Sequence, residues 1–327
     1  MALRRKFNTK ANSDLNTGFG VNSNDSGGRF INREGFPNIK KRGLPFFQRY
    51  SWFHTMLSIP IFKFLLFILL VFITINIFFA SLYLLIGIEH LGGVVKGKSI
   101  HNFLEAFFFS LQTYTTVGYG RINPVGYMTS SIAAFEAFLG LMTFALATGL
   151  LYARFSKPNA YLRFSDLAVI APYKNITALM LRFVPYRNNY LTDVEAKVSL
   201  VIKAEENGNL TNRFFNLTLE LSKINALSLS WTIVHPIDEN SPLYGLSEYD
   251  FKSTSMEVMV FVKGFDEAYS NTVVARTSYT NNEIVYGAKY LMMFHPDERG
   301  MQTILELDKL NDIEKKEMPP LPVITSV

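Results

Sequence analysis

The sequence predicts a two-span α-helical membrane domain followed by an all-β sandwich. Residues 61–88 and 127–155 form two apolar stretches, each long enough to cross a bilayer as a helix. After Pro158 the apolar runs become short and are separated by Gly, Pro, Asn and Asp clusters, which is typical of a strand sandwich. Hydrophobic residues make up 49% of the 327 residues and the mean hydropathy is +0.14, which excludes a largely disordered chain.

The composition also excludes several classes of function. The chain has no cysteine, so it can have no disulfide framework, thiolate cluster or cysteine nucleophile. The five histidines show no metal-ligand spacing, and no Ser-His-Asp arrangement is indicated. A net charge of +5 is modest for a protein that binds nucleic acid. We therefore expect neither an enzyme nor a nucleic-acid-binding protein.

The first 60 residues predict two segments. Residues 1–43 are rich in Asn, Ser, Gly and basic residues without apolar periodicity, so we expect a disordered tail. Residues 44–60 predict an interfacial amphipathic helix that Pro60 ends, with an ordinary surface helix as the alternative. The apolar side chains that recur at helical spacing in it are Phe46, Tyr50, Phe53 and Leu57.

Charge sets the expected topology of the two spans. The first carries one charge, Lys63, at its start, where the side chain can reach the headgroups. The second carries Glu136 inside and Arg154 at its end, so we expect it to be buried among partners. Ten basic and three acidic residues precede Ser51, whereas the loop between the spans holds three basic residues. Both termini are therefore expected in the cytoplasm of a multi-pass inner-membrane protein.

The loop between the spans is too apolar for an ordinary connection. Residues 103–114 predict a short re-entrant helix, and residues 115–120 read TTVGYG. Successive carbonyl oxygens can face one axis only if some residues adopt backbone angles that a Cβ disfavours, which explains Gly118 and Gly120. Irregular backbone at membrane depth is tolerated where it lines a water-filled path or is buried in protein. One loop supplies only part of the ligands of a dehydrated cation, so four copies around an axis are implied.

The chain resembles the prokaryotic inward-rectifier potassium channels, the KirBac family, over roughly residues 45 to 295. The resemblance implies a homotetramer that conducts K⁺ passively, with K⁺ as the permeant ion and no other cofactor. It also implies an interfacial slide helix at residues 44–60, a pore domain at 61–158, an immunoglobulin-like cytoplasmic sandwich at 159–310 and a C-terminal tail at 311–327. The phrases that carry the resemblance are FFFSLQTYTTVGYG, ALATGLLYARFSKP, FSDLAVIAP, LSLSWTIVHPIDENSPLYG, VFVKGFDEA and NNEIVYGAKY.

The resemblance assigns roles to matched positions. Tyr152 matches the bulky gate residue at the crossing of the inner helices. A helical period places Leu141, Ala145 and Thr148 within about 40° of Tyr152, which predicts one pore-lining stripe. The resemblance adds Phe144 to the expected pore lining, because it matches a cavity position of the family. The selectivity filter is expected at Thr115, Thr116, Val117, Gly118, Tyr119 and Gly120, with Val117 and Tyr119 packed against the re-entrant helix. The matched cytoplasmic constriction comprises Gly264, Phe265 and Ala268.

Two residues are expected to support the filter from behind. Glu136 lies about 160° from Tyr152 on a helical wheel, so it should face the re-entrant helix. We expect a structural role for it, with Gln112 or the Thr115 hydroxyl as its partner, and direct ion coordination is the alternative. In eukaryotic relatives an ion pair flanks the loop, and the matched positions here are Gln112 and Arg121. Arg121 is therefore expected to lack its usual partner.

Other differences between this chain and the family predict how the chain is regulated. Strongly rectifying relatives place acids where this chain has Phe144 and Lys263, so block by polyamines and hence rectification should be weak. Arg49, Arg154 and Lys157 are candidates for binding anionic lipid headgroups, with simple topology-setting charge as the alternative.

A calcium-gated two-span channel would carry a Rossmann-type domain, and no GxGxxG supports one. The remaining alternative is a non-conducting, membrane-anchored β-sandwich that acts as a binding or sensor module.

Overall fold

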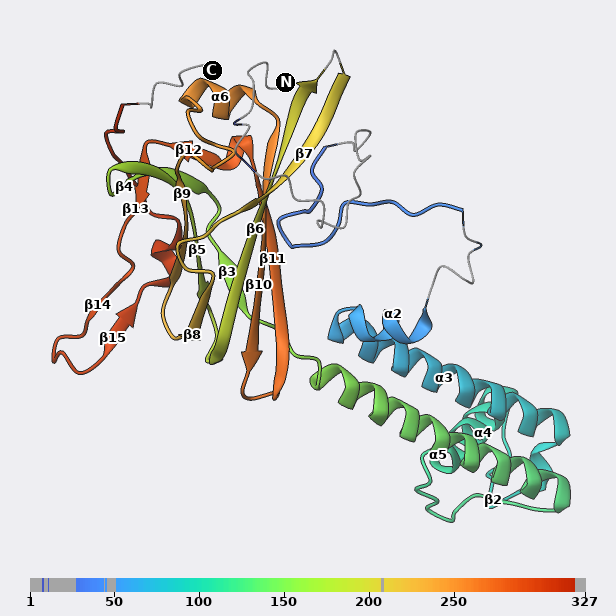
Figure 1. Cartoon of the computed structure of the whole chain (residues 1–327). Coiled ribbons are helices and arrows are strands. Elements are labelled where there is room, and N and C mark those ends of the chain that lie inside the picture. Colours follow the sequence, from blue (N-terminus) through green and yellow to red (C-terminus); the bar gives the residue numbers. More distant parts are fainter. Residues whose placement is uncertain are drawn as a thin grey trace. The chain divides into compact units, whose positions relative to one another are not determined.

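A computed structural model describes residues 8, 11, 28–43, 45, 51–206 and 209–320 of the chain. The chain divides into two compact units (Figure 1). The helical unit comprises Arg42–Lys157, and the β unit comprises Pro158–Val327 together with the N-terminal residues up to Lys41.

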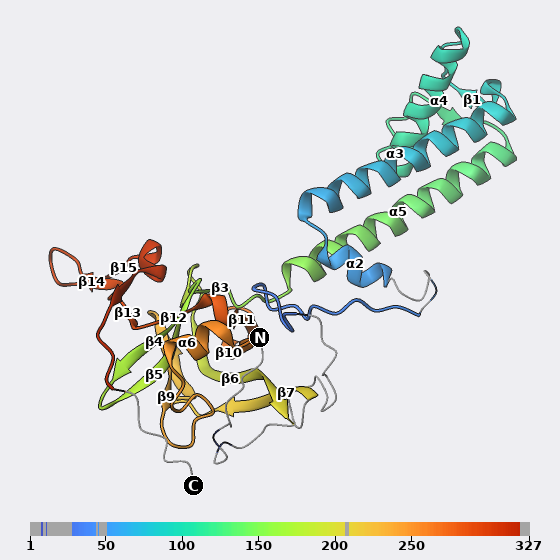
Figure 2. The ribbon, with the colours of Figure 1, turned by 90° about the horizontal axis from the view of Figure 1, so that it is seen from above.

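The helical unit holds two long helices that are each long and apolar enough to cross a membrane, α3 and α5. Figures 1 and 2 show them side by side, with the shorter helix α4 at one end of the pair. Phe79 and Tyr83 of α3, Ala106 and Phe109 of α4, and Ala133 of α5 form one buried cluster. The bounds are Trp52–Ser58 for α2, Ile61–Ile86 for α3, Ser99–Tyr114 for α4 and Tyr127–Phe155 for α5.

Local residues explain where these helices begin and end. Gly87 adopts φ +118° and ends α3, and a short 3₁₀ turn, η2 (Ile88–His90), follows. Ser51 caps α2 by accepting a hydrogen bond from the backbone of His54, so α2 covers Trp52–Ser58 within the segment 44–60 in which an interfacial helix was expected. Residues 46–50, including Arg49, lie outside the described residues. Helix α4 begins at Ser99, four residues before the expected position 103. The sequence did not indicate this first turn, because Ser99, His101 and Asn102 are polar.

Two five-stranded sheets form most of the described part of the β unit (Figure 1). The first has the order β11-β10-β6-β7, with β8 also paired to β6, and the second has the order β12-β4-β5-β3, with β9 also paired to β5. The strands of the first sheet are β6 (Leu191–Glu206), β7 (Asn209–Leu217), β8 (Lys223–Leu227), β10 (Met256–Asp266) and β11 (Asn271–Thr280). The strands of the second are β3 (Leu162–Phe164), β4 (Ala168–Tyr173), β5 (Ile176–Pro185), β9 (Trp231–Ile237) and β12 (Ile284–Tyr286).

Alternating side chains of the two sheets meet in a single core. Leu200 of β6 and Val260 of β10 are buried in the same cluster as Leu181 of β5 and Ile233 of β9. In β9 buried and half-buried residues alternate along the whole strand, which is the period-2 pattern of a strand with one face in the core. The antiparallel pairing of β9 with β5 fixes this register. The all-β sandwich is confirmed.

The β unit continues past residue 310, where a tail was expected. Strand β16 pairs antiparallel with β13, and Met318 packs against the sandwich core. The buried Arg182 donates to the carbonyls of Lys309 (2.8 Å) and Leu310 (2.6 Å), and it lies over the Tyr290 ring. Burial lowers the pKa of this guanidinium. The smaller elements are α6 (Glu248–Ser253), η3 (Asn281–Glu283), β13 (Ala288–Tyr290), β14 (Phe294–Pro296), β15 (Thr303–Leu305), η4 (Leu307–Asn311) and β16 (Ile313–Lys315).

The described part of the N-terminal tail is held against the first sheet, contrary to the expected disorder. The carboxylate of Glu257 in β10 accepts hydrogen bonds from the backbone N–H groups of Phe30 (2.6 Å) and Ile31 (3.0 Å). Arg29 Nε donates to Ser278 Oγ (2.8 Å) and pairs with Glu283 (3.1 Å). Glu257 is only 5% exposed, so its carboxylate needs such donors. Backbone donors leave no side-chain pattern in the sequence, which is why this attachment was missed.

The attachment of the tail can be tested with Glu257→Ala. The substitution removes the acceptor of two charge-assisted hydrogen bonds, so amide exchange at Phe30 and Ile31 should accelerate by at least about tenfold. Hydrogen exchange of the full chain, read by mass spectrometry, measures this. The control is Glu248→Ala, which removes an exposed acid that pairs with Lys252 and should leave the segment protected. Equal protection in both variants would contradict the attachment.

Candidate functional site

The TTVGYG loop leaves the end of α4 in a backbone conformation that ordinary residues avoid. Gly118 and Gly120 adopt φ +55° and +85°, as the motif predicted. A Cβ added at either glycine would meet no atom within 4 Å inside this chain. Glycine is therefore needed at these positions for its backbone conformation and not for lack of space. Thr116 also adopts a positive φ, +60°, which the sequence did not indicate and which is unusual for a β-branched residue. Such strain is typical of functional sites.

Gln112, in the last turn of α4, binds the loop through three acceptor contacts. Its backbone oxygen accepts from the N–H groups of Val117 (2.9 Å) and Gly118 (3.2 Å), and its side-chain Oε1 accepts from the N–H of Tyr119 (3.1 Å). The N–H of Thr116 donates to the oxygen of Thr113 at 3.0 Å. Four consecutive backbone donors therefore point back toward α4.

The direction of these donors fixes the direction of four carbonyl groups. In a trans peptide the C=O points opposite to the N–H of the same plane. The carbonyls of Thr115, Thr116, Val117 and Gly118 therefore point away from α4, on the far side of the loop. None of the hydrogen bonds within the described part of the chain uses these four oxygens. The loop thus presents a row of free carbonyl oxygens, which is the ligand type that replaces the hydration shell of an alkali cation.

Helix α5 approaches the end of α4 very closely. A Cβ built on Gly140 would lie 1.9 Å from the backbone oxygen of Tyr114, so no other residue fits there without movement. The hydroxyl of Tyr114 donates to Thr143 Oγ1 at 2.7 Å, one turn further along α5. These two contacts fix the end of α4 from which the loop departs.

Glu136 of α5 is buried and faces α4, as the helical period predicted. Its expected partners were wrong. Its carboxyl group contacts the hydroxyl of Tyr83 on α3 (2.6 Å) and the hydroxyl of Ser110 on α4. Gln112 is occupied by Tyr119, and the Thr115 hydroxyl donates to the backbone oxygen of Leu111 (2.7 Å). The sequence could not reveal partners that lie 26 and 53 residues away.

Arg121 has a partner, contrary to expectation. Its Nη2 lies 2.7 Å from Oε2 of Glu105 on α4. Glu105 precedes Gln112 by seven residues, which is two helical turns, so both lie on one face of α4. The acid that pairs with Arg121 in this chain is therefore Glu105, two helical turns before the matched position Gln112.

The predicted pore-lining stripe of α5 is uncovered by the rest of the chain. Tyr152 is 74% exposed, and the other members of the stripe are exposed as well, namely Leu141, Phe144, Ala145 and Thr148. Val117 and Tyr119 are 52% and 84% exposed, so the expected packing of these side chains against α4 does not occur within one chain. The free carbonyls and this apolar stripe are surfaces that a single chain leaves without a partner.

Arg154, in the last turn of α5, contacts the end of α2. Its guanidinium donates to the backbone oxygens of Met56 and Ile59, at the end of α2, and lies 4.8 Å from the centre of the Phe64 ring. These carbonyls are the ones that an α-helix leaves unpaired at its C-terminus. Lys157 is exposed.

In the β unit, the candidate constriction lies at the turn between β10 and β11. Gly264 packs against Val194, since a Cβ there would lie 3.2 Å from its side chain, and Phe265 is exposed. Asp266 Oδ1 accepts from the N–H of Ala268 (2.9 Å), which shapes the turn. Lys263 lies in register with Glu195 of β6, whose carboxylate forms an ion pair with Lys197.

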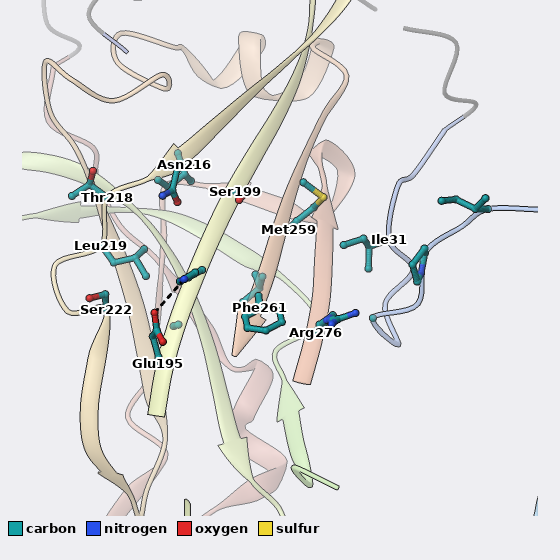
Figure 3. Close-up of a pocket in the computed structure, with 17 residues that line it drawn as sticks. Ile31, Glu195, Ser199, Asn216, Thr218, Leu219, Ser222, Met259, Phe261 and Arg276 are labelled. Carbon is teal, nitrogen blue, oxygen red and sulfur yellow. Dashed lines mark ion pairs between the residues drawn. The ribbon is translucent and has the colours of Figure 1, made fainter. Parts of the chain in front are cut away.

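A groove of about 910 Å³ lies on the outer face of the first sheet, next to the N-terminal segment at Ile31 (Figure 3). Glu195 and Lys197 in it form an ion pair of 3.4 Å, and Arg276 lies over the Phe261 ring. These charged side chains are already engaged with neighbours, so the groove is a weaker candidate for a binding site than the TTVGYG loop.

The close approach at Gly140 can be tested with Gly140→Ala. The added methyl group must displace the end of α4, so the thermal midpoint of the full chain in detergent should fall by several degrees. Gly149→Ala is the matched control on the same helix, because a Cβ there meets no atom within 4 Å and alanine favours a helix. Equal midpoints for the two variants would contradict the importance of this contact.

Two protein families match the chain. The family described as "Ion channel" matches residues 64–157, which contain α3, α4, the TTVGYG loop and α5. The family described as "Inward rectifier potassium channel C-terminal domain" matches residues 162–325, which make up half of the chain and contain the β sandwich.

Named relatives agree with these matches. The chain is 34% identical over 292 residues to the inward rectifier potassium channel Kirbac3.1 of Paramagnetospirillum magnetotacticum, covering 87% of this chain and 95% of that protein. It is 28% identical over 201 residues to inward rectifier potassium channel 18 of Homo sapiens, covering 58% and 46%. It is 27% identical over 288 residues to ATP-sensitive inward rectifier potassium channel 12 of Bos taurus, covering 80% and 66%. The chain therefore belongs to the inward rectifier potassium channel family, a family of ion channels rather than enzymes, as its sequence motifs predicted.

Proposed function

We propose that four copies of this chain form a K⁺-selective pore in the inner membrane, with the TTVGYG loops as the selectivity filter. The observation that carries the proposal is the row of four carbonyls directed away from α4. One loop surrounds an ion on one side only, so a full shell of oxygen ligands needs several copies around one axis. K⁺ is then the permeant ion, held in turn by the carbonyl oxygens of Thr115, Thr116, Val117 and Gly118.

The remaining parts of the path follow from the exposed stripe of α5. Leu141, Phe144, Ala145 and Thr148 line the cavity below the filter, and the Tyr152 ring closes it at the inner helix crossing. Gly264, Phe265 and Ala268 form a second constriction on the cytoplasmic side. The topology expected from charge places both termini in the cytoplasm.

Rectification should be weak because the positions that would attract polyamines carry no net negative charge. Phe144 is apolar, and Lys263 lies opposite Glu195 across the strands. A cationic blocker would therefore meet a cavity lined by Phe144 and a cytoplasmic site where Glu195 has two lysines as neighbours, Lys197 in an ion pair and Lys263 on the adjacent strand.

Anionic lipids are proposed to bind at the inner leaflet through Lys157 rather than through Arg154. Arg154 already gives its donors to the end of α2, whereas the Lys157 side chain is exposed. An exposed lysine near the membrane surface gains about 1 kcal/mol from anionic headgroups. Arg154 then acts as a link between the interfacial helix and the segment that carries Tyr152.

Cation flux into liposomes tests the proposed conduction. Purified full-length protein should take up potassium and rubidium in preference to sodium, and barium should block the uptake. Tyr152→Ala should raise uptake because it removes the ring at the proposed gate. Gly118→Ala is the matched non-conducting control, because alanine disfavours the φ of +55° that the loop requires. No uptake in several lipid mixtures, even with Tyr152→Ala, would favour the non-conducting membrane-anchored module.

The two proposed roles at the inner leaflet can be separated by substitution. Arg154→Lys keeps the charge but cannot span the carbonyls of Met56 and Ile59 with a planar fork, so it should change flux as strongly as Arg154→Gln. Lys157→Gln should instead reduce only the dependence of flux on anionic lipid. The measurement is flux in vesicles with and without anionic lipid. Wild-type flux for Arg154→Lys would contradict the link and favour a simple charge effect.

A further inference from the structure

Four polar side chains form one closed cluster between the three large helices of the helical unit. Asn76 and Tyr83 lie on α3, Ser110 on α4 and Glu136 on α5, and all four are almost completely buried. Tyr83 and Ser110 contact the two carboxyl oxygens of Glu136, and Ser110 Oγ also lies 3.1 Å from Asn76 Oδ1. Because each group has a limited number of protons, the directions of these hydrogen bonds can be derived.

The orientation of Asn76 is fixed by its own helix. One terminal atom of its amide lies 2.7 Å from the backbone oxygen of Phe72. A carbonyl oxygen can only accept, so this atom must be the NH₂ group. The amide oxygen therefore faces Ser110, and it can only accept a hydrogen bond from the Ser110 hydroxyl.

The single proton of Ser110 then determines the state of Glu136. A serine hydroxyl has one proton, so Ser110 can donate to Asn76 or to Glu136 but not to both. The amide oxygen of Asn76 can never donate, whereas a carboxyl oxygen donates when it is protonated, so every contact is satisfied only if Ser110 donates to Asn76. Toward Glu136 the serine can only accept, so the facing carboxyl oxygen must carry a proton. The other carboxyl oxygen accepts from the Tyr83 hydroxyl at 2.6 Å. With an ionised Glu136, either Asn76 or the carboxylate would face lone pairs of Ser110, which buried polar groups avoid.

The charges around the cluster agree with a neutral carboxyl group. None of the ion pairs in the described part of the chain involves Glu136. On α4, Glu105 is paired with Arg121, and on α5, Arg154 is bound to the end of α2. An ionised carboxylate with no exposed surface and no cation beside it would be strongly unfavourable.

We propose that Glu136 is held protonated in a directional hydrogen-bond chain that runs from Tyr83 through Glu136 and Ser110 to Asn76. The chain joins α4 to both long helices two residues before Gln112, which binds the TTVGYG loop. We infer that Glu136, Ser110 and Asn76 are positioning residues for the filter. The effect on ion selection rests on the proposed channel function, whereas the protonation state does not.

Glu136→Gln is the decisive variant. A glutamine has one acceptor oxygen for Tyr83 and one NH₂ group for Ser110, so it reproduces the protonated carboxyl group but not a carboxylate. Its thermal midpoint should match that of the wild-type protein, and its ratio of potassium to sodium flux should stay within about twofold of the wild-type ratio. Glu136→Ala and Ser110→Ala should lower that ratio by at least about tenfold. Glu136→Gln behaving like Glu136→Ala would overturn the proposal.

Infrared spectroscopy of the full-length protein gives a readout independent of conduction. The wild-type protein should show a protonated-carboxyl C=O band that disappears in Glu136→Gln. Glu105→Gln is the matched control, since Glu105 is ion-paired with Arg121 and its substitution should leave the band unchanged. Absence of a Glu136-dependent band would refute the protonation. A protein that shows this band but conducts no cations would refute the proposed channel function alone.

Discussion

The geometry of the TTVGYG loop depends on the contact between Gly140 of α5 and the end of α4. Without a Cβ at Gly140, the backbone of α5 comes against the Tyr114 oxygen, and the Tyr114 hydroxyl binds Thr143 on the same helix. Gln112 lies in this fixed turn and takes up three N–H groups of the loop. The direction of the carbonyls thus depends on helix packing as well as on the positive φ angles within the loop.

Polar side chains in the helical unit are satisfied in two ways. The hydroxyls of Thr74, Ser81 and Ser131 donate to the carbonyl four residues earlier in their own helix. Such local bonds allow a polar residue to face an apolar environment without a partner from another helix. Ser110 and Glu136 instead bond between helices. The polar contacts that join α3, α4 and α5 therefore lie behind the loop, and a separate contact joins Arg154 of α5 to the end of α2.

The sequence predicted what depends on local pattern and missed what depends on distant contacts. Helix α5 has the predicted bounds 127–155, because an apolar run delimits it, and the glycines of the loop identified its unusual backbone. The partners of Glu136 and Arg121 were missed because they lie on other turns or other helices. The attachment of Phe30 to Glu257 was missed because backbone groups make it. The positive φ of Thr116 contradicts its own residue preference, so only the structure could reveal it.

The free carbonyls are the physical reason for proposing several copies of the chain. Each unpaired carbonyl in the hydrocarbon region costs several kcal/mol, and this loop directs four of them away from its own helix. Lipid offers no donors, so water or cations must face them. The exposed stripe of α5 that contains Phe144 and Tyr152 would also contact this water if the chain were alone, which is unfavourable for apolar side chains. Copies arranged around the carbonyls satisfy both constraints at once, because the same rotation that surrounds the ion brings the stripes together.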